Sequence, residues 1–339
     1  MDYREEPYLG EGQTPVLSLT SLARHFGLPR ISAKAEYLNP TGSYKDRIAA
    51  ATIKDAVQRG HTGWIGTSSG NGGAAMSAYG SRAGLPGFLC IPTSTPPEKL
   101  KSIVPYGTTL FLMSEIGMRE MDSIKNLADE FNLKMSVTAY QYNPEGMKGA
   151  ELIGSELRAQ GSFTHVYVPT GGGGLLVAVA RGLHDESQTS PKIVCAQPTG
   201  CGPISRHLQN ELNVPVISSC ESMISGLLLP DPPDGILATE AVHRTDGWGC
   251  LVDDKNTYAM QDLLAQIEGI FVEPASALAL AAMIQDFRQG LISESDNPLV
   301  ILTGSGLKDL RRFGKPESVS THVASLSDLK SKLETTFNY

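Results

Sequence analysis

The chain has 339 residues, enough for two domains, and its 41% hydrophobic and 19% charged residues are an ordinary balance for a globular protein. A net charge of −8 without a basic block argues against nucleic acid as a partner, and no apolar run approaches the ~18 residues that a membrane-spanning helix needs. The polar, acidic residues 1–13 resemble neither a secretory signal nor a transit peptide, so we expect a cytoplasmic protein.

Strand-like and helix-like segments alternate along the chain in two series. The first series predicts helices at Tyr44–Arg59, Gly73–Ala83, Pro97–Val104 and Met118–Phe131, and strands at Trp64–Thr67, Phe88–Ile91, Thr109–Met113 and Lys134–Thr138. The second predicts helices at Glu145–Ala159, Leu175–Leu183, Thr257–Glu268 and Ala275–Arg288, and strands at His165–Pro169, Lys192–Gln197, Cys250–Val252 and Leu299–Leu302. Such alternation is typical of parallel sheets covered by helices on both faces, and two series predict two such domains.

The cysteines and histidines show no metal-binding or disulfide pattern. The five cysteines are odd in number and contain no C-x-x-C pair, so we expect reduced thiols without a disulfide framework or a structural zinc site. The seven histidines are scattered, and we assign no metal.

The segment "TSSGNGGAA" (67–75) follows a predicted strand and opens a predicted helix. Open parallel sheets bind ligands beyond the carboxyl ends of their strands. Ser68, Ser69 and Asn71 offer hydroxyl and amide groups there, and the glycines expose backbone N–H groups at a helix start, which suits a carboxylate. An ordinary glycine-rich turn is the alternative interpretation.

Four consecutive glycines, Gly171, Gly172, Gly173 and Gly174, lie in "VPTGGGGLL" (168–176), again between a strand and a helix. They let the backbone wrap a compact dianion at a helix N-terminus. The segment is not a P-loop, because no G-K-[ST] follows. It is also a poor dinucleotide fingerprint, since Leu176 stands where a glycine is needed and Gln197 ends the next strand. A single phosphate fits better, although a flexible turn is the alternative.

Thr303 lies at the end of the last predicted strand, in "LVILTGSGLKD" (299–309). A hydroxyl fixed there can reach into a cleft between the two domains. A simple strand-terminating turn is the alternative.

Lys45 lies in "NPTGSYKDR" (39–47), in what should be the first turn of a helix. Ser43 is a good N-cap, and Asp46 three residues later completes an S-x-x-D capping arrangement. The positive end of the helix dipole and any burial disfavour the ammonium form of Lys45, and a neutral amine is a nucleophile toward a carbonyl. A solvated lysine is the alternative. A poised lysine, a phosphate loop, a carboxylate loop and a hydroxyl at a strand end together are what pyridoxal 5'-phosphate requires.

Five segments, in the same order, resemble the fold-type II pyridoxal-phosphate enzymes, the tryptophan synthase β-subunit superfamily, and threonine synthases in particular. They are "LGEGQTP" (9–15), "NPTGSYKDR" (39–47), "SSGNGG" (68–73), "EGIFVEPASALALAA" (268–282) and "TGSGLKD" (303–309). The resemblance implies two open parallel-sheet, three-layer domains with the cofactor in the cleft between them. It places residues 1–61 and 146–325 in a large cofactor-binding domain and 62–145 in a small domain with the asparagine and substrate-carboxylate loop, and it leaves 326–339 as a tail or helix. It also implies a homodimer.

The resemblance implies a role for each candidate site residue. It makes Lys45 the residue that binds the cofactor covalently and shuttles protons, with Tyr44 packed near the cofactor ring. Asn71 would be hydrogen-bonded to the 3'-oxygen of the cofactor, Thr303 would lie at its pyridine nitrogen, and its phosphate would be bound by Gly171, Gly172, Gly173 and Gly174. The substrate carboxylate would be bound by Ser68, Ser69 and Gly72. A neutral hydroxyl at Thr303 would leave the pyridine nitrogen largely unprotonated, which favours elimination and replacement over transamination.

Several positions depart from the threonine synthase pattern. The four glycines stand where threonine synthases carry a G-N-x-G-N-like loop, and they are closer to serine/threonine dehydratases and serine racemase. Ser305 replaces a histidine or asparagine, and residues 201–248 are divergent. Lys148 has a threonine-synthase-like context and could meet a substrate phosphate, or it could be a solvated helix lysine.

The expected activity is therefore that of a lyase acting at the γ or β carbon of a (phospho)amino acid, with conversion of O-phosphohomoserine to threonine and phosphate as the default. A serine/threonine dehydratase or a β-replacement, cysteine-synthase-like enzyme is the alternative within the superfamily. A nucleotide-binding Rossmann protein or a catalytically silent relative is the alternative of a different class.

Overall fold

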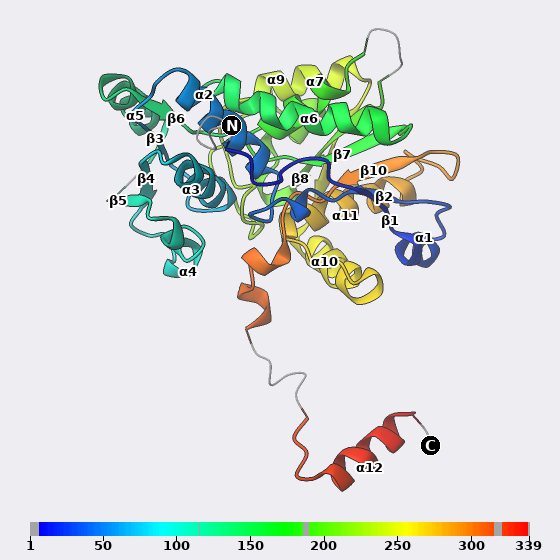
Figure 1. The fold of residues 1–339 in the computed structure, drawn as a ribbon. Coiled ribbons are helices and arrows are strands. Elements are labelled where there is room, and N and C mark those ends of the chain that lie inside the picture. Colours follow the sequence, from blue (N-terminus) through cyan, green and yellow to red (C-terminus); the bar gives the residue numbers. More distant parts are fainter. Residues whose placement is uncertain (1–6, 115, 186–189, 315–320, 338–339) are drawn as a thin grey trace. The chain divides into compact units, whose positions relative to one another are not determined.

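The computed structural model describes residues 7–114, 116–185, 190–314 and 321–337. The described residues up to Lys308 form one compact unit, which contains two β-sheets flanked by helices (Figure 1), and those from Asp309 onward form a second unit with the helix α12 (Leu326–Phe337). The two sheets confirm the predicted α/β fold class. Across the described ranges, no helix is long and apolar enough to cross a membrane.

The smaller sheet has four strands in the order β5-β4-β3-β6, all parallel. They are β3 (Gly63–Gly66), β4 (Gly87–Pro92), β5 (Thr109–Met113) and β6 (Leu133–Met135), and the covering helices are α2 (Lys45–Gln58), α3 (Asn71–Ala83) and α5 (Met118–Glu130). Successive side chains of a strand point to opposite faces. Trp64 accordingly packs with residues of α2 and α3, and Ile65 with residues of α5, so the sheet is covered on both faces.

The larger sheet has six strands in the order β1-β2-β10-β7-β8-β9. They are β1 (Val16–Ser18), β2 (Ser32–Lys34), β7 (His165–Pro169), β8 (Lys192–Pro198), β9 (Trp248–Val252) and β10 (Pro298–Ile301), and the covering helices are α1 (Thr20–Phe26), α6 (Pro144–Gln160), α7 (Gly174–Leu183), α8 (Pro203–Leu208), α9 (Gly235–Arg244), α10 (Asp254–Glu268) and α11 (Pro274–Arg288). Figure 1 shows α6, α7 and α9 on one side of this sheet and α10 and α11 on the other. A separate apolar cluster lies beneath each group of helices.

The sequence patterns missed five α-helices and strands and extended one helix too far. The missed elements are β1, α1, β2, α8 and α9. The two strands have only three residues each, α8 has six residues, and α1 and α9 start without a side-chain cap, so none has a strong local signal. β1 also pairs antiparallel with β2, an exception to the parallel pattern. The helix predicted over Pro97–Val104 ends at Leu100 as α4 (Pro97–Leu100) and is followed by a separate 3-10 turn, η2 (Val104–Tyr106).

The expectation that all cysteines are free thiols is wrong for one pair. Cys201 and Cys220 form a disulfide, with 4.6 Å between their Cα atoms, whereas Cys90, Cys195 and Cys250 are free and buried. The backbone brings the pair together, because the N–H of Glu221 donates to the carbonyl oxygen of Gly200 at 2.7 Å. This turn lies in the stretch for which the sequence gives no pattern, so nothing local predicts it.

Candidate active site

Lys45 lies in the first turn of α2, as the sequence predicts, but the helix begins at Lys45 rather than Tyr44 and the predicted capping box is not formed. The N-cap is Tyr44, without a side-chain cap bond. Ser43 forms an antiparallel backbone bridge with Gly304 instead, and its hydroxyl is buried without a hydrogen-bond partner among the described residues. Asp46 accepts from the backbone N–H of Thr41 at 3.0 Å. The tertiary bridge therefore replaces the local cap.

The side chain of Lys45 points toward the segment that follows β6. Its Nζ donates to Thr138 Oγ1 at 2.7 Å and lies 4.6 Å from the ring centroid of Tyr44. The Tyr44 ring and the Lys45 amine are thus neighbours, as they would need to be for both to contact one cofactor.

The four glycines join β7 to α7 and begin the helix. Gly173 is the N-cap, with φ of 91°, a left-handed conformation that favours glycine, and Gly174 is the first helical residue. A Cβ at Gly174 would lie 2.8 Å from Asp234 Oδ2 and 3.3 Å from the Thr138 carbonyl oxygen. The loop therefore requires small residues, and the first N–H groups of α7, which have no acceptor within the helix, can bind an anion.

Asp234 fixes the surroundings of this glycine loop. Its backbone N–H donates to the Gly172 carbonyl oxygen at 3.0 Å, and its carboxylate accepts from the N–H of Tyr140 at 2.9 Å and of Gln141 at 3.4 Å. Burial raises the pKa of Asp234, against the lowering effect of these amides and of nearby Arg181 and Lys45. The divergent stretch 201–248 thus packs directly on the loop that the sequence assigns to the phosphate.

Ser68 and Ser69 lie in the loop between β3 and α3, whereas Gly72 is the second residue of α3 and lies next to Thr138. A Cβ on Gly72 would lie 3.0 Å from Ser68 Oγ and 3.7 Å from Thr138 Cγ2. Both serines are half-buried. The structure thus brings the Ser68–Gly72 side of the loop, Lys45 and the glycine loop together around Thr138.

Asn71 is the first residue of α3, and its amide contacts a carboxylate far away in the sequence. Asn71 Nδ2 lies 2.9 Å from each carboxylate oxygen of Glu273, the N-cap of α11. The backbone N–H of Glu273 donates to the Gly304 carbonyl oxygen at 2.9 Å. Glu273 therefore couples Asn71 to the segment that carries Thr303.

Thr303 lies two residues after the end of β10, the last buried strand, and is only 6% exposed. Its Oγ1 lies 2.9 Å from Ser276 Oγ of α11, and its carbonyl oxygen accepts from the N–H of Tyr44 at 3.0 Å. The Thr303 hydroxyl thus belongs to a neutral hydroxyl pair. The backbone of Thr303 is hydrogen-bonded to Tyr44, the residue before Lys45.

Lys148 lies apart from the residues described above. Its side chain is 61% exposed, and its ammonium pairs with Glu145 at 2.8 Å on the same face of α6. No other polar partner of Lys148 is found in the described part of the chain. The structure therefore gives no contact that supports a role for Lys148 in binding a substrate phosphate.

Thr41, Ser43, Asp46 and Lys308 form a largely buried, incompletely hydrogen-bonded region beside Lys45, which we call the Asp46 region. Burial raises the pKa of Asp46 to about 6, against the opposing effects of Thr41 and of the Lys308 ammonium. Burial also lowers the pKa of Lys308, against nearby Glu273 and Asp46, and its Nζ donates to the Thr41 carbonyl oxygen at 2.6 Å. Asp46 Oδ1 and the Thr41 and Ser43 hydroxyls have no hydrogen-bond partner among the described residues.

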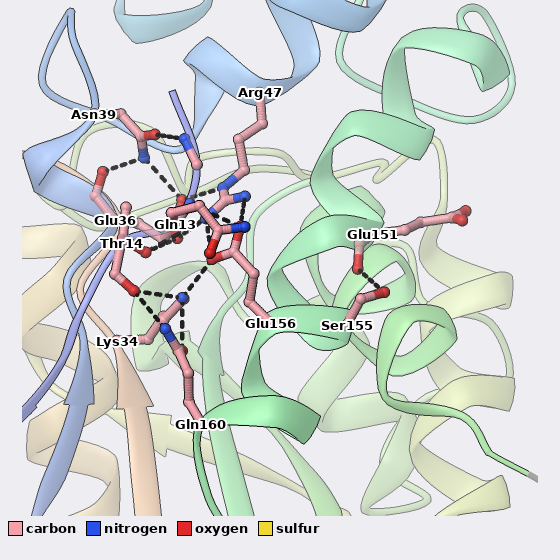
Figure 2. Close-up of polar contacts among 11 residues, drawn as sticks. Gln13, Thr14, Lys34, Glu36, Asn39, Arg47, Glu151, Ser155, Glu156 and Gln160 are labelled. Atoms are coloured by element: carbon pink, nitrogen blue, oxygen red, sulfur yellow. Dashed lines mark hydrogen bonds and ion pairs between the residues drawn. The ribbon is translucent and has the colours of Figure 1, made fainter. Parts of the chain in front are cut away.

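Arg47 enters a different buried region, which Figure 2 shows as a closed set of ion pairs. Its guanidinium contacts Glu36 at 2.8 Å and Glu156 at 2.6 Å. Glu156 also accepts a hydrogen bond from Lys34 Nζ at 2.6 Å, and Lys34 Nζ donates another to Gln160 Oε1 at 2.8 Å. We call Lys34, Glu36, Arg47 and Glu156 the ion-pair network. It joins β2, α2 and α6, and therefore holds the first turn of α2 in place.

The charges of the ion-pair network stabilise one another. Burial acts to raise the pKa of Glu156, but hydrogen bonds from Arg47 and Lys34 outweigh it and hold that pKa at about 2. Burial acts to lower the pKa of Arg47, but Glu156 and Glu36 outweigh it and raise that pKa. For Lys34, burial outweighs the nearby carboxylates and lowers the pKa. Two cations face two carboxylates, so the network is neutral as a whole.

Thr138, Asp234, Glu273 and Ser276 are site residues that the sequence reasoning did not identify. Thr138 had a usable signal, because it ends a predicted parallel strand, the edge at which such sheets bind ligands. Glu273 and Ser276 lie in a segment that resembles threonine synthases, but the resemblance gave them no role. Asp234 lies in the divergent stretch and had no signal.

The residues present fit pyridoxal 5'-phosphate. The glycine loop at the start of α7 can hold a phosphate, and the Lys45 amine is linked to this loop through Thr138. Thr303 and Ser276 form a neutral hydroxyl pair that can face a ring nitrogen. The Thr303 backbone is hydrogen-bonded to Tyr44, the residue before Lys45. Each feature belongs to the cofactor's ordinary requirements.

Comparisons with known proteins agree with this geometry. Threonine synthase of Halalkalibacterium halodurans is 29% identical over 306 residues, which cover 89% of this chain and 84% of the relative. Maize serine racemase has a similar fold, with a TM-score of 0.75 and 21% identity over 96% of this chain and 93% of the other. The processed form of threonine deaminase isoform 2 from Solanum lycopersicum has a TM-score of 0.74 and 21% identity over 86% and 79%.

The family model described as "Pyridoxal-phosphate dependent enzyme" matches residues 8–304, most of the chain. This range includes Lys45, the glycine loop and Thr303. The chain therefore belongs to the family of pyridoxal-phosphate dependent enzymes, as the five segments of the sequence indicate.

Proposed function

We propose that the protein is a lyase of threonine-synthase type that eliminates or replaces a group at the γ or β carbon of a (phospho)amino acid, with O-phosphohomoserine giving threonine and phosphate as the default reaction. The threonine synthase of H. halodurans, 29% identical over 89% of this chain, supports the substrate class. The observation that carries the proposal is the convergence of Lys45, the Gly72 segment and Gly174 on Thr138.

When bound, pyridoxal 5'-phosphate stabilises negative charge at the substrate α-carbon. Gly171, Gly172, Gly173 and Gly174 would hold its phosphate, Asn71 its 3'-oxygen and Thr303 its ring nitrogen, with Tyr44 packed near the ring. Lys45 would anchor it and take the proton from the substrate α-carbon. Ser68, Ser69 and Gly72 would bind the substrate carboxylate, which fixes the α-carbon in front of the Lys45 amine.

The hydroxyl pair of Thr303 and Ser276 favours elimination and replacement. A hydroxyl is neutral, so it does not stabilise a protonated ring nitrogen as a carboxylate would. Thr303 and Ser276 would therefore hold the ring nitrogen without adding charge to it, which would favour loss of a leaving group over transamination.

The test combines a spectrum and an assay. The purified protein loaded with the cofactor should absorb at ~410–420 nm, and Lys45→Ala should abolish this band. Lys125→Ala, an exposed lysine on α5, is the control that should keep it. Wild type should release phosphate and threonine from O-phosphohomoserine in equal amounts. A loaded enzyme that leaves O-phosphohomoserine unchanged would exclude the default reaction.

A serine/threonine dehydratase or β-replacement enzyme is the second candidate, favoured by the four-glycine loop. It would release a 2-oxoacid from threonine or serine, or exchange the β-substituent, without using O-phosphohomoserine. The position of Lys148 bears on the choice. If it binds a substrate phosphate, Lys148→Ala should raise KM for O-phosphohomoserine while leaving KM for threonine or serine unchanged.

We also propose, from the resemblance alone, a small domain at residues 62–145, a large domain at 1–61 and 146–325, and a homodimer. Sedimentation of the loaded protein tests the dimer, and a mass of one chain would contradict it. Hydrogen exchange with and without substrate tests the division into two domains. If the division is right, the protection of backbone amides should change on substrate binding near residues 61–62 and 145–146.

A further inference from the structure

Thr138 is the common neighbour of three segments with proposed roles. Its Oγ1 accepts from Lys45 Nζ at 2.7 Å. Its methyl carbon lies 3.7 Å from the position that a Cβ would take on Gly72, and its carbonyl oxygen lies 3.3 Å from the corresponding position on Gly174. A side chain in this place touches the amine and lies beside the loops proposed for the substrate carboxylate and for the phosphate.

The backbone on both sides of Thr138 is fixed by bonds to different parts of the structure. Before it, Ser136 donates to the Ile65 carbonyl oxygen from its N–H at 2.8 Å and from its hydroxyl at 3.0 Å. After it, the N–H of Tyr140 donates to the Asp234 carboxylate at 2.9 Å. The Thr138 hydroxyl is therefore presented to Lys45 by a backbone with little freedom, which is what orienting a reactive group requires.

An amine that takes a proton needs its lone pair free and correctly aimed. In the contact with Thr138, Lys45 donates an N–H and the hydroxyl oxygen accepts, so the lone pair of a neutral amine is not used. The Tyr44 ring, with its centroid 4.6 Å from Nζ, limits the space beside the amine. Two neighbours thus restrict the directions in which the lone pair can point.

We propose that Thr138 is a positioning residue, whose hydroxyl oxygen accepts a hydrogen bond from the free amine of Lys45 and so aims the lone pair of that amine at the α-proton of the substrate. The inference rests on the role of Lys45 in the proposed function. In the step concerned, the C–H bond of the α-carbon breaks, its electron pair stays on the substrate, and a new N–H bond forms at Nζ. Thr138 keeps its own proton throughout.

The test compares Thr138→Val, which keeps the shape and removes the hydroxyl, with Thr138→Ser, which keeps the hydroxyl. The first measurement is the rate at which cofactor-free protein takes up pyridoxal 5'-phosphate, followed at ~410–420 nm. A misaimed amine should react about 10-fold more slowly in Thr138→Val and reach the same final absorbance, whereas Thr138→Ser should stay within about 3-fold of wild type. Circular dichroism shows that each variant is folded.

The second measurement is turnover of whichever amino acid the assay above identifies. Thr138→Val should lower kcat by about 10- to 100-fold with KM within about 3-fold, and Thr138→Ser should restore most of kcat. Uptake and turnover of Thr138→Val at wild-type rates would overturn the proposal, and so would a Thr138→Ser variant as slow as Thr138→Val.

The two proposals fail in different ways. If wild type forms no band, or if Lys45→Ala forms one, the role of Lys45 is wrong and with it the proposed function. If the band depends on Lys45 and Thr138→Val behaves as wild type, only the role of Thr138 is wrong.

Discussion

Asp46 and Arg47 follow Lys45 in the sequence, and their charged side chains enter two buried regions with opposite character. Arg47 joins the ion-pair network, where every charge has an opposite partner within 2.8 Å. Asp46 lies in a region where one of its own oxygens and two hydroxyls, those of Thr41 and Ser43, have no hydrogen-bond partner among the described residues. Both side chains are at most 2% exposed, so burial alone does not explain the difference.

The contrast indicates that the two buried regions next to Lys45 have different roles. A paired buried charge resists changes in pH, as the low pKa of Glu156 shows. An underpaired carboxylate titrates near neutrality, as the raised pKa of Asp46 shows. We infer that the ion-pair network fixes the position of the helix that carries Lys45, and that the Asp46 region carries the pH response. Removing groups from each side in turn can break or sharpen this comparison.

The largest effect is expected from Glu156→Gln, which leaves Arg47 and Lys34 with one unpaired buried positive charge. Breaking one partner of a buried ion pair costs about 3–5 kcal/mol of unfolding free energy. Urea unfolding of the full chain at neutral pH measures this loss. The Asp46 region should be unaffected, because it shares no hydrogen bond with Glu156.

The matched control is Glu240→Gln on the surface of α9. Glu240 pairs with Arg244 at 3.4 Å, four residues away, and both side chains are more than half exposed. Its loss should cost less than about 0.5 kcal/mol. Similar losses in Glu156→Gln and Glu240→Gln would show that the network does not hold the helix.

The same contrast explains how much the sequence could predict. Lys45 at a helix start and the glycines between a strand and a helix are local patterns, and the structure has both. The partners of these residues are not local: Thr138 lies 93 residues from Lys45, and Glu273 lies 202 residues from Asn71. A sequence pattern shows which groups are present near a strand end, but their pairing depends on how the sheets pack.

Two wrong expectations have the same physical origin. Ser43 looks like an N-cap, yet its backbone bridge to Gly304 takes precedence over the local bond. The Cys201–Cys220 disulfide depends on a backbone turn in a stretch without regular periodicity. In each case a tertiary contact overrides a local preference, and the structure of the segment cannot be read from its own residues.

A smaller effect, with a defined sign, is expected from Asp46→Asn as the pH changes. Burial raises the pKa of Asp46 from its ordinary 3.8 to about 6, so its stabilising contribution is present below the ordinary value and is lost as the pH rises through 6. Between about pH 5 and about pH 7.5, wild type should lose roughly 1.4 kcal/mol of unfolding free energy relative to Asp46→Asn. Urea unfolding of both proteins across this range gives the difference, and a difference that does not change with pH would show that Asp46 is not the titrating group.

The smallest effects come from removing one buried hydroxyl on each side. Thr14 Oγ1 donates a hydrogen bond to Glu36 Oε1 at 2.7 Å. Thr14→Val removes this donor from the Glu36 carboxylate of the ion-pair network and should lower the unfolding free energy by about 1 kcal/mol. Ser43→Ala removes a hydroxyl that has no hydrogen-bond partner among the described residues, and should change the unfolding free energy by less than about 0.5 kcal/mol or increase it. Both residues are buried and each variant loses one hydroxyl, so thermal and urea unfolding of the pair isolate the value of the partner. If the two variants lose equal stability, the two regions do not differ in hydrogen bonding.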